Sequence, residues 1–233
     1  MEISDYQKRY ADTLAYLQTK KCILFLTTSN RHGGWPTSEV PKSTQLALKL
    51  AEKLGDKVTV IDVTKLNIEP CHGNVSTAKG NVCGLPEAVL EDKTKNPTGQ
   101  HRCRINHFNA DDELWKISKV LFECDTVVFF TSVRRGQTNS FYQKLIERLN
   151  WIENRHTTLG ESSLIEHVDA GIIITGHNRN GELVLDTQKK VLGYYGFQIP
   201  NELSRNRFFT TNPDDESKEW YKKAVEVFHE TFG

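Results

Sequence analysis

Residues 126–131 read TVVFFT, and residues 22–28 read CILFLTT. Both are continuous apolar runs that end in hydroxyl side chains, a pattern typical of strands buried on both faces. Two more segments share this character, the β-branched KVTVIDV at 57–63 and AGIIIT at 170–175. A shorter strand is predicted near 207–210. Strands of this kind indicate an α/β fold with a parallel sheet.

Helical patterns fill the chain between these strands, marked by apolar residues three or four apart and by capping signals. The expected helices cover residues 1–20, 43–54, 111–124, 139–154 and 184–194, with a last helix after Pro213. This alternation predicts helices on both faces of the sheet, joined by right-handed crossovers.

The interval 64–110 breaks the alternation. It is rich in glycine and proline, and its one helical candidate is a short segment near Glu87. A stretch of this length without regular structure is usually functional. We therefore expect a single domain, residues 1–233, with an N-terminal helix at 1–20 and a long insertion at 64–110.

Composition excludes several classes of function. The formal net charge is zero and no block of like charge stands out, which argues against nucleic acid and membrane-surface partners. Residues 1–20 carry charges throughout and lack the apolar run of a signal peptide, and no stretch reaches membrane-spanning length. Five cysteines at irregular spacings predict reduced thiols in a cytoplasmic protein.

Ligands of such sheets bind outside the carboxyl ends of the strands. The first of these loops contains Ser29 and Arg31 and enters the next helix through Ser43 and Thr44. Hydroxyl groups, a guanidinium and a helix N-terminus together favour a phosphate. The alternative is an ordinary loop in which Ser43 or Thr44 caps the helix. The dinucleotide and Walker fingerprints are absent.

The loop after the TVVFFT strand, residues 131–139, reads TSVRRGQTN. It resembles the strand-end segment of the NAD(P)H-dependent FMN reductases and of their relatives, the iron–sulfur flavoproteins. Thr131, Val133 and Gly136 match the Thr-Pro-hydrophobic-Tyr-x-Gly pattern of that family, and Glu147-Arg148 falls at its Asp-Arg pair. The departures from the pattern are Ser132 for Pro, Arg134 for Tyr and Gln143 for Lys. The later Thr175-Gly176-His177-Asn178 resembles the third flavin-contacting segment of the family.

The resemblance implies a flavodoxin-like fold with five parallel strands in the order 2-1-3-4-5 and a bound FMN. Ser29, Arg31, Ser43 and Thr44 would hold the phosphate. Thr131, Ser132, Val133, Arg134, Arg135 and Gly136 would lie along the isoalloxazine edge, with Thr175, Gly176 and Asn178 on its other side. Positive charge from Arg134 and Arg135 would favour the reduced, anionic flavin, unless both are ordinary solvated arginines. No side chain is expected to act as an acid or base, because the flavin carries the chemistry.

The insertion carries Cys71, Cys83 and Cys103, but Asn74 and Thr77 stand where the iron–sulfur relatives place their two middle cysteines. Only two of the four cluster positions then carry a cysteine, so we expect no iron–sulfur cluster. A zinc site drawn from these cysteines with His72, His101 and His107 is the alternative, although no Cys-x2-Cys or His-x3-His pair supports it. We therefore predict no metal.

The function expected from this resemblance is an oxidoreductase that passes hydride from NAD(P)H to FMN and on to a small-molecule acceptor: a quinone, free flavin, nitro or azo compound. The residues do not distinguish NADH from NADPH. A flavodoxin-type electron carrier is less favoured, because such carriers are usually strongly acidic. A non-catalytic ligand-binding or redox-sensing protein of the same fold is the third possibility.

A homo-oligomer, dimer or tetramer, is also expected. The resemblance points that way, and the predicted helix 139–154 carries apolar residues beyond the roughly 100° stripe that covering a sheet requires. The alternative is that the insertion or the N-terminal helix covers this surface within one chain.

Overall fold

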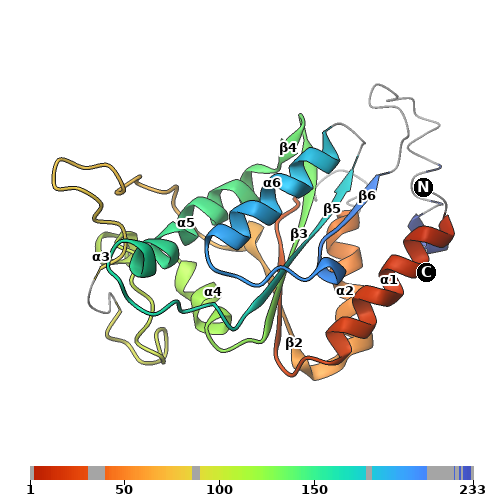
Figure 1. The fold of residues 1–233 in the computed structure, drawn as a ribbon. Coiled ribbons are helices and arrows are strands. Elements are labelled where there is room, and N and C mark those ends of the chain that lie inside the picture. Colours follow the sequence, from red (N-terminus) through yellow and green to blue (C-terminus); the bar gives the residue numbers. More distant parts are fainter. Residues whose placement is uncertain are drawn as a thin grey trace.

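The computed structural model describes residues 3–30, 40–85, 90–176, 180–208, 223, 226 and 228–231. Its centre is a six-stranded sheet in the order β2-β1-β3-β5-β6, with β4 paired to β3 alone (Figure 1). The strands are β1 (Ile23–Thr27), β2 (Val58–Asp62), β3 (Thr126–Arg134), β4 (Gln137–Thr138), β5 (Asp169–Gly176) and β6 (Arg205–Phe208). All pairings are parallel except that of β3 with β4. Counted without β4, the strands follow the predicted order.

The sheet is buried on both faces because its central strands carry continuous apolar runs whose side chains point to both sides. Leu24 and Phe129 face one core, whereas Phe25 and Phe130 face the other. In β1 every residue is buried, and the first six residues of β3 are buried too. This explains why the strands show continuous apolar runs in the sequence instead of alternation.

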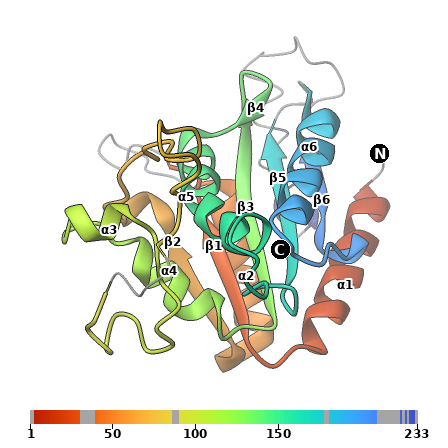
Figure 2. The same ribbon diagram turned by 60° about the vertical axis from the view of Figure 1, so that its left-hand side comes forward.

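Helices cover the two faces as separate groups (Figures 1 and 2). Apolar side chains of α1 (Ile3–Gln18) and α2 (Lys42–Leu54) belong to one core, and those of α4 (Leu114–Leu121), α5 (Ser140–Thr157) and α6 (Gly181–Tyr194) belong to the other. The short elements are α3 (Ile105–Phe108), η1 (Gly55–Lys57), η2 (Val63–Lys65) and η3 (Asn201–Leu203). The predicted helices are confirmed within a few residues, apart from the candidate near Glu87, which falls at residues outside the described part. Residues 223, 226 and 228–231 are helical, as predicted for the C-terminal region.

One predicted boundary is wrong. The strand expected to end at Thr131 continues as β3 to Arg134. The chain then turns back, and β4 pairs antiparallel with the end of β3. The turn residues Arg135 and Gly136 have φ of 52° and 78°. A positive φ at both central residues matches the twist of a tight hairpin, and glycine adopts it readily. The expected loop is therefore a β-hairpin, called here the β3–β4 hairpin.

The insertion packs against α5, and this overturns one argument made from the sequence. Leu149, Trp151 and Ile152 are 0%, 1% and 0% exposed. Cys83, Cys103 and Ile105 of the insertion belong to the same core. The apolar surplus of α5 is thus covered within one chain and gives no reason to expect a subunit interface there.

Hydrogen bonds from α5 to insertion carbonyls fix this packing. Arg148 Nη1 donates to Glu69 O at 2.7 Å, Arg155 Nη1 donates to Leu85 O at 2.9 Å, and Asn154 Nδ2 donates to Cys83 O. A chain segment with little regular structure needs such partners, because buried carbonyls are costly when left unpaired. Within the described residues, no helix has the length and apolarity needed to cross a bilayer.

Candidate functional site at the strand ends

The carboxyl ends of β1, β3 and β5 bring the predicted site residues to one edge of the sheet. The register places Thr27 beside Phe130 and Ser132 beside Thr175. Two members of the predicted set, Arg31 and Asn178, lie outside the described residues. The others can be located.

Ser29 and Ser43 meet at this edge. Ser43 Oγ donates to Ser29 Oγ at 2.8 Å, and the two residues are 1% and 6% exposed. Ser43 lies in the first turn of α2, and the half-buried Thr44 follows it. Pro41 precedes this helix and no side chain of the described residues caps it, so the amides of the first turn point out of the helix without an intrahelical acceptor. Such a turn, with hydroxyl groups beside it, suits an anion.

Asn139 connects this turn to the β3–β4 hairpin. It is 2% exposed, and its Oδ1 caps α5 by accepting from Tyr142 N at 3.1 Å. Its Nδ2 is directed at hydroxyl oxygens of both loops: Thr131 at 2.9 Å, Thr28 at 3.2 Å, Ser132 at 3.3 Å and Ser29 at 3.4 Å. Sequence analysis did not include Asn139 in the site. Its position before an apolar helix was the available signal, because asparagine is a favoured N-cap.

The hairpin contributes charge and backbone. Arg134 Nη2 donates to Asn30 O at 2.9 Å and therefore ties the hairpin to the first loop. Arg135 is exposed at the turn. Thr131 is buried, and Ser132 and Val133 are half-buried. Both arginines are exposed, but Arg134 is engaged with a neighbouring carbonyl.

Thr175 and Gly176 lie directly beside the hairpin. Thr175 is 3% exposed, and a Cβ placed on Gly176 would come within 3.5 Å of the Val133 backbone. Gly176 has φ of 146°, which side chains rarely allow. A glycine is therefore required where β5 ends against β3.

The matched Glu147-Arg148 pair does not lie in this site. The guanidinium of Arg148 binds Asp112 at two points, with Nη1 to Oδ2 at 2.6 Å and Nη2 to Oδ1 at 3.0 Å. Burial opposes ionisation of Asp112, but the hydrogen bonds from Arg148 and from Glu69 N hold its pKa below the ordinary value. This pair fixes the insertion to α5.

The cysteines of the insertion line a cavity of only about 20 Å³, together with Arg148 and Trp151. Burial raises the pKa of Cys83 to about 11 and also raises that of Cys103. All five cysteines are free. Protonated, buried thiols are poor nucleophiles and poor metal ligands. Among the described residues, no group of three or more His, Cys, Asp or Glu side chains is arranged to hold a metal ion.

Both ring nitrogens of His101, a candidate zinc ligand, have side-chain partners. Its Nδ1 lies 2.8 Å from Ser118 Oγ and its Nε2 lies 2.8 Å from Asn106 Oδ1. Burial lowers the pKa of this histidine to about 4. It is a neutral core residue that joins the insertion to α4.

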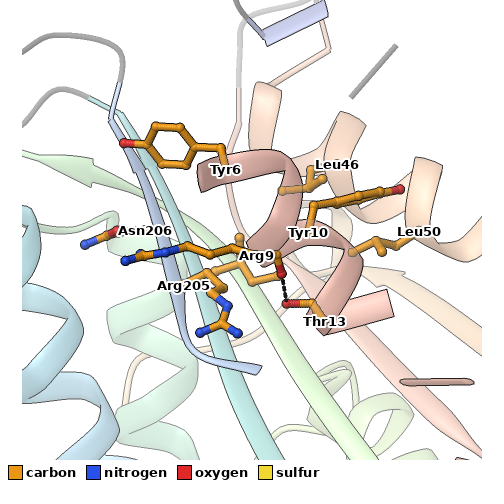
Figure 3. A pocket seen from close by; sticks show the side chains of 9 residues that line it. Tyr6, Arg9, Tyr10, Thr13, Leu46, Leu50, Arg205 and Asn206 are labelled. Atoms are coloured by element: carbon orange, nitrogen blue, oxygen red, sulfur yellow. Dashed lines mark hydrogen bonds between the residues drawn. The ribbon is translucent and has the colours of Figure 1, made fainter. Parts of the chain in front are cut away.

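A separate cavity lies between α1, α2 and β6 (Figure 3). Arg9 from α1 and Arg205 from β6 line it, beside Tyr6 and Tyr10. Burial, with a smaller effect of Arg9, lowers the pKa of Arg205. The cavity measures about 30 Å³, room for about two water molecules, so it is too small for a cofactor.

No protein-family model and no curated protein sequence matches the chain. Solved structures do match its architecture. RosB with bound 8-demethyl-8-formylriboflavin-5'-phosphate superposes with a TM-score of 0.56 at 16% identity, over 90% of this chain and 75% of that chain. The chain has a flavodoxin-like fold.

Two azoreductases support the same assignment of the flavodoxin-like fold. The azoreductase from Bacillus anthracis str. Sterne gives a TM-score of 0.52 at 15% identity, over 91% of this chain and 95% of that chain. Azoreductase AzrA gives 0.51 at 16% identity with the same coverage. At these identities the likeness concerns the fold.

Proposed function

We propose that this flavodoxin-like protein is an FMN-dependent oxidoreductase that uses NAD(P)H and passes reducing equivalents to a small-molecule acceptor. The observation that carries the proposal is the Asn139 side chain, which joins Ser29 of the first loop to Thr131 and Ser132 of the hairpin at the strand ends. The fold binds its ligands at this edge. The matched structures add support, since they are a protein with a bound flavin phosphate intermediate and azoreductases.

The donors present fit FMN. Its phosphate would be held by the open first turn of α2 and the hydroxyl groups of Ser29, Ser43 and Thr44, with Arg31 as the proposed counter-charge. Its ring would lie against the backbone of the β3–β4 hairpin, with Thr175, Gly176 and Asn178 on the other side. When bound, flavin supplies the hydride and electron chemistry.

The residues of the chain have positioning roles in this proposal. Asn139 holds the two loops at a fixed separation. Arg134 is anchored to Asn30 O, and Arg135 adds a positive charge at the hairpin tip. A positive charge near the ring favours its anionic reduced form. No side chain is assigned a proton transfer.

The test begins with the absorption spectrum of purified protein, before and after FMN is added. We expect one FMN per chain and flavin-dependent oxidation of NAD(P)H that accelerates with a quinone or azo acceptor. Protein that remains colourless with excess FMN contradicts the proposal. Flavin binding without nicotinamide oxidation supports the electron-carrier or sensing alternative instead.

Two further proposals stand apart from the site: the family resemblance favours a homo-oligomer, and the irregularly spaced cysteines favour a cytoplasmic protein. Light scattering of the flavin-loaded protein at micromolar concentration tests the first. A monomer mass with intact nicotinamide oxidation contradicts it.

A further inference from the structure

The outer face of α6 carries two exposed apolar side chains. Leu183 and Tyr194 are 64% and 67% exposed, and with Phe108 of α3 they are the three most exposed large apolar side chains of the described residues. Both views place α6 at the surface of the molecule, beside β5 and β6 (Figures 1 and 2). A helix that covers a sheet usually has a polar outer face. Leucine and tyrosine on the outer face of α6 therefore indicate a contact surface.

Leu183 and Tyr194 belong to one stripe along this face. Thr187 and Lys190 lie between them, so the four residues are spaced by four, three and four positions, which places their side chains on one side of the helix. Thr187 and Lys190 are exposed as well. The stripe is roughly 16 Å long at the rise of an α-helix. We call these four residues the α6 stripe.

The α6 stripe has the same character in both directions: large apolar, polar, polar, large apolar. Its outer pair and its inner pair share one midpoint. An antiparallel second copy of the helix therefore places Leu183 against the partner's Tyr194 and Thr187 against the partner's Lys190. A two-fold interface requires this kind of self-complementarity, because one surface meets itself.

Charges along the same face have the order that an antiparallel pair needs. Glu182 and Asp186 are exposed in the N-terminal half of α6, and Lys190 is exposed in the C-terminal half. In the antiparallel arrangement the acidic half of each helix faces the basic half of the other, which brings Asp186 close to the partner's Lys190. The helix dipole favours the same order of charge within one chain, but it gives no reason for an exposed leucine and tyrosine.

We propose that the outer face of α6 forms a two-fold interface with a second copy of this chain. The inference rests on the α6 surface and not on the flavin site. It names a surface for the homo-oligomer that the family resemblance favours, in place of α5, whose apolar residues are covered by the insertion. A contact made mainly by one helix from each copy is at the small end of specific interfaces, so the dimer should be weak and depend on concentration.

Sedimentation velocity of the unaltered protein, flavin-free and flavin-loaded, measures the association. Over protein concentrations from about 1 to 300 μM, we expect the mass to rise from that of a monomer to that of a dimer, with a midpoint of roughly 10–100 μM. A monomer mass at the highest concentration in both forms overturns the proposal.

Apolar variants locate the interface. Leu183→Ser and Tyr194→Ser should each weaken the dimer about tenfold or more, because each substitution occurs twice in a two-fold dimer. Phe108→Ser is the matched control, since this side chain is as exposed but lies on α3, and it should leave the association unchanged. A dimer that survives both α6 variants overturns the proposal and leaves a homo-oligomer formed by another surface.

Charge variants test the antiparallel arrangement. Lys190→Glu places a carboxylate beside the partner's Asp186 and should weaken the dimer, as should Asp186→Lys alone. The double variant Asp186→Lys, Lys190→Glu exchanges the two charges and should recover the affinity of the unaltered protein to within about threefold. A double variant no better than the single ones overturns the antiparallel pairing. Circular dichroism melting verifies that each variant is folded. A protein that dimerises in this way but binds no FMN keeps this inference and contradicts only the proposed flavin function.

Discussion

Arg148 and Asp112 form a two-point ion pair with both side chains 0% exposed, and this pair joins the insertion to α5. The family resemblance placed Arg148 at an Asp-Arg pair in the helix after the flavin loop, and the structure shows that it joins this helix to the insertion. Asp112 lies just after the insertion and accepts from Glu69 N, and Arg148 donates to Glu69 O, so both members of the pair bind Glu69 of the insertion.

Replacing Arg148 by Met should destabilise the protein by about 3–5 kcal/mol, because the change leaves the Asp112 carboxylate buried without its counter-ion. Urea denaturation measures the loss. Lys93→Met, at an exposed lysine of the insertion, is the matched control and should change stability by less than about 0.5 kcal/mol. Equal midpoints for the two variants would show that the pair contributes nothing.

Asn139→Ala should weaken FMN binding and lower the melting temperature, because the side chain both joins the two loops and caps α5. Loss of an N-cap is worth about 1 kcal/mol. Asn139→Ser keeps a capping oxygen but is too short to reach both loops. It should therefore recover most of the stability and little of the FMN affinity. Full recovery of affinity in the serine variant would contradict the positioning role. Fluorescence titration with FMN provides the affinity.

Ser43→Ala and Arg31→Ala should weaken FMN binding and leave riboflavin binding nearly unchanged, since riboflavin lacks the phosphate. A charge-assisted bond to phosphate is worth about 1.5–3 kcal/mol, so Arg31→Ala should cost tenfold or more in affinity. Ser43→Ala, which removes a neutral hydroxyl, should cost less. If riboflavin weakens as much as FMN, the phosphate lies elsewhere.

His101 should make the protein less stable in mild acid. Its folded-state pKa is about 4, whereas the ordinary value is 6.5, so only the unfolded chain binds the proton between these two pH values. Stability is therefore fully present above pH 6.5 and is lost progressively as pH falls towards 4, by up to roughly 3 kcal/mol. Urea denaturation at pH 7.5 and pH 5 measures the difference. In His101→Gln the difference between the two pH values should shrink, whatever the variant's absolute stability.

The sequence predicted the sheet well, because burial on both faces leaves an unmistakable apolar run in β1, β3 and β5. The β3–β4 hairpin was not predicted, because Arg135 adopts a positive φ and arginine is not a residue type that indicates such a turn. Cover of α5 by the insertion was predicted only as the alternative to a subunit interface, for a different reason. Insertion contacts such as Cys103 with Arg148 join residues far apart in sequence, and no local pattern encodes them.

The structure brings those predicted site residues that it describes to one edge of the sheet, and it places Asn139 between them. Ser29 and Ser43 meet as their positions after β1 and at the start of α2 suggest. Asn139 was not predicted as a site residue. Its side chain both caps α5 and contacts the two loops, and the capping role alone is enough to explain an asparagine at this position. The flavin-binding roles themselves stay predictions until the titrations described above are made.

The hydrogen bonds that α5 gives to the insertion also bear on how this chain can be altered. Arg148, Asn154 and Arg155 donate to carbonyl groups of Glu69, Cys83 and Leu85. Shortening the insertion to resemble a minimal sheet protein would remove these carbonyl acceptors from three buried side chains of α5. The insertion and α5 therefore depend on each other, and grafting either one onto a related fold requires grafting both.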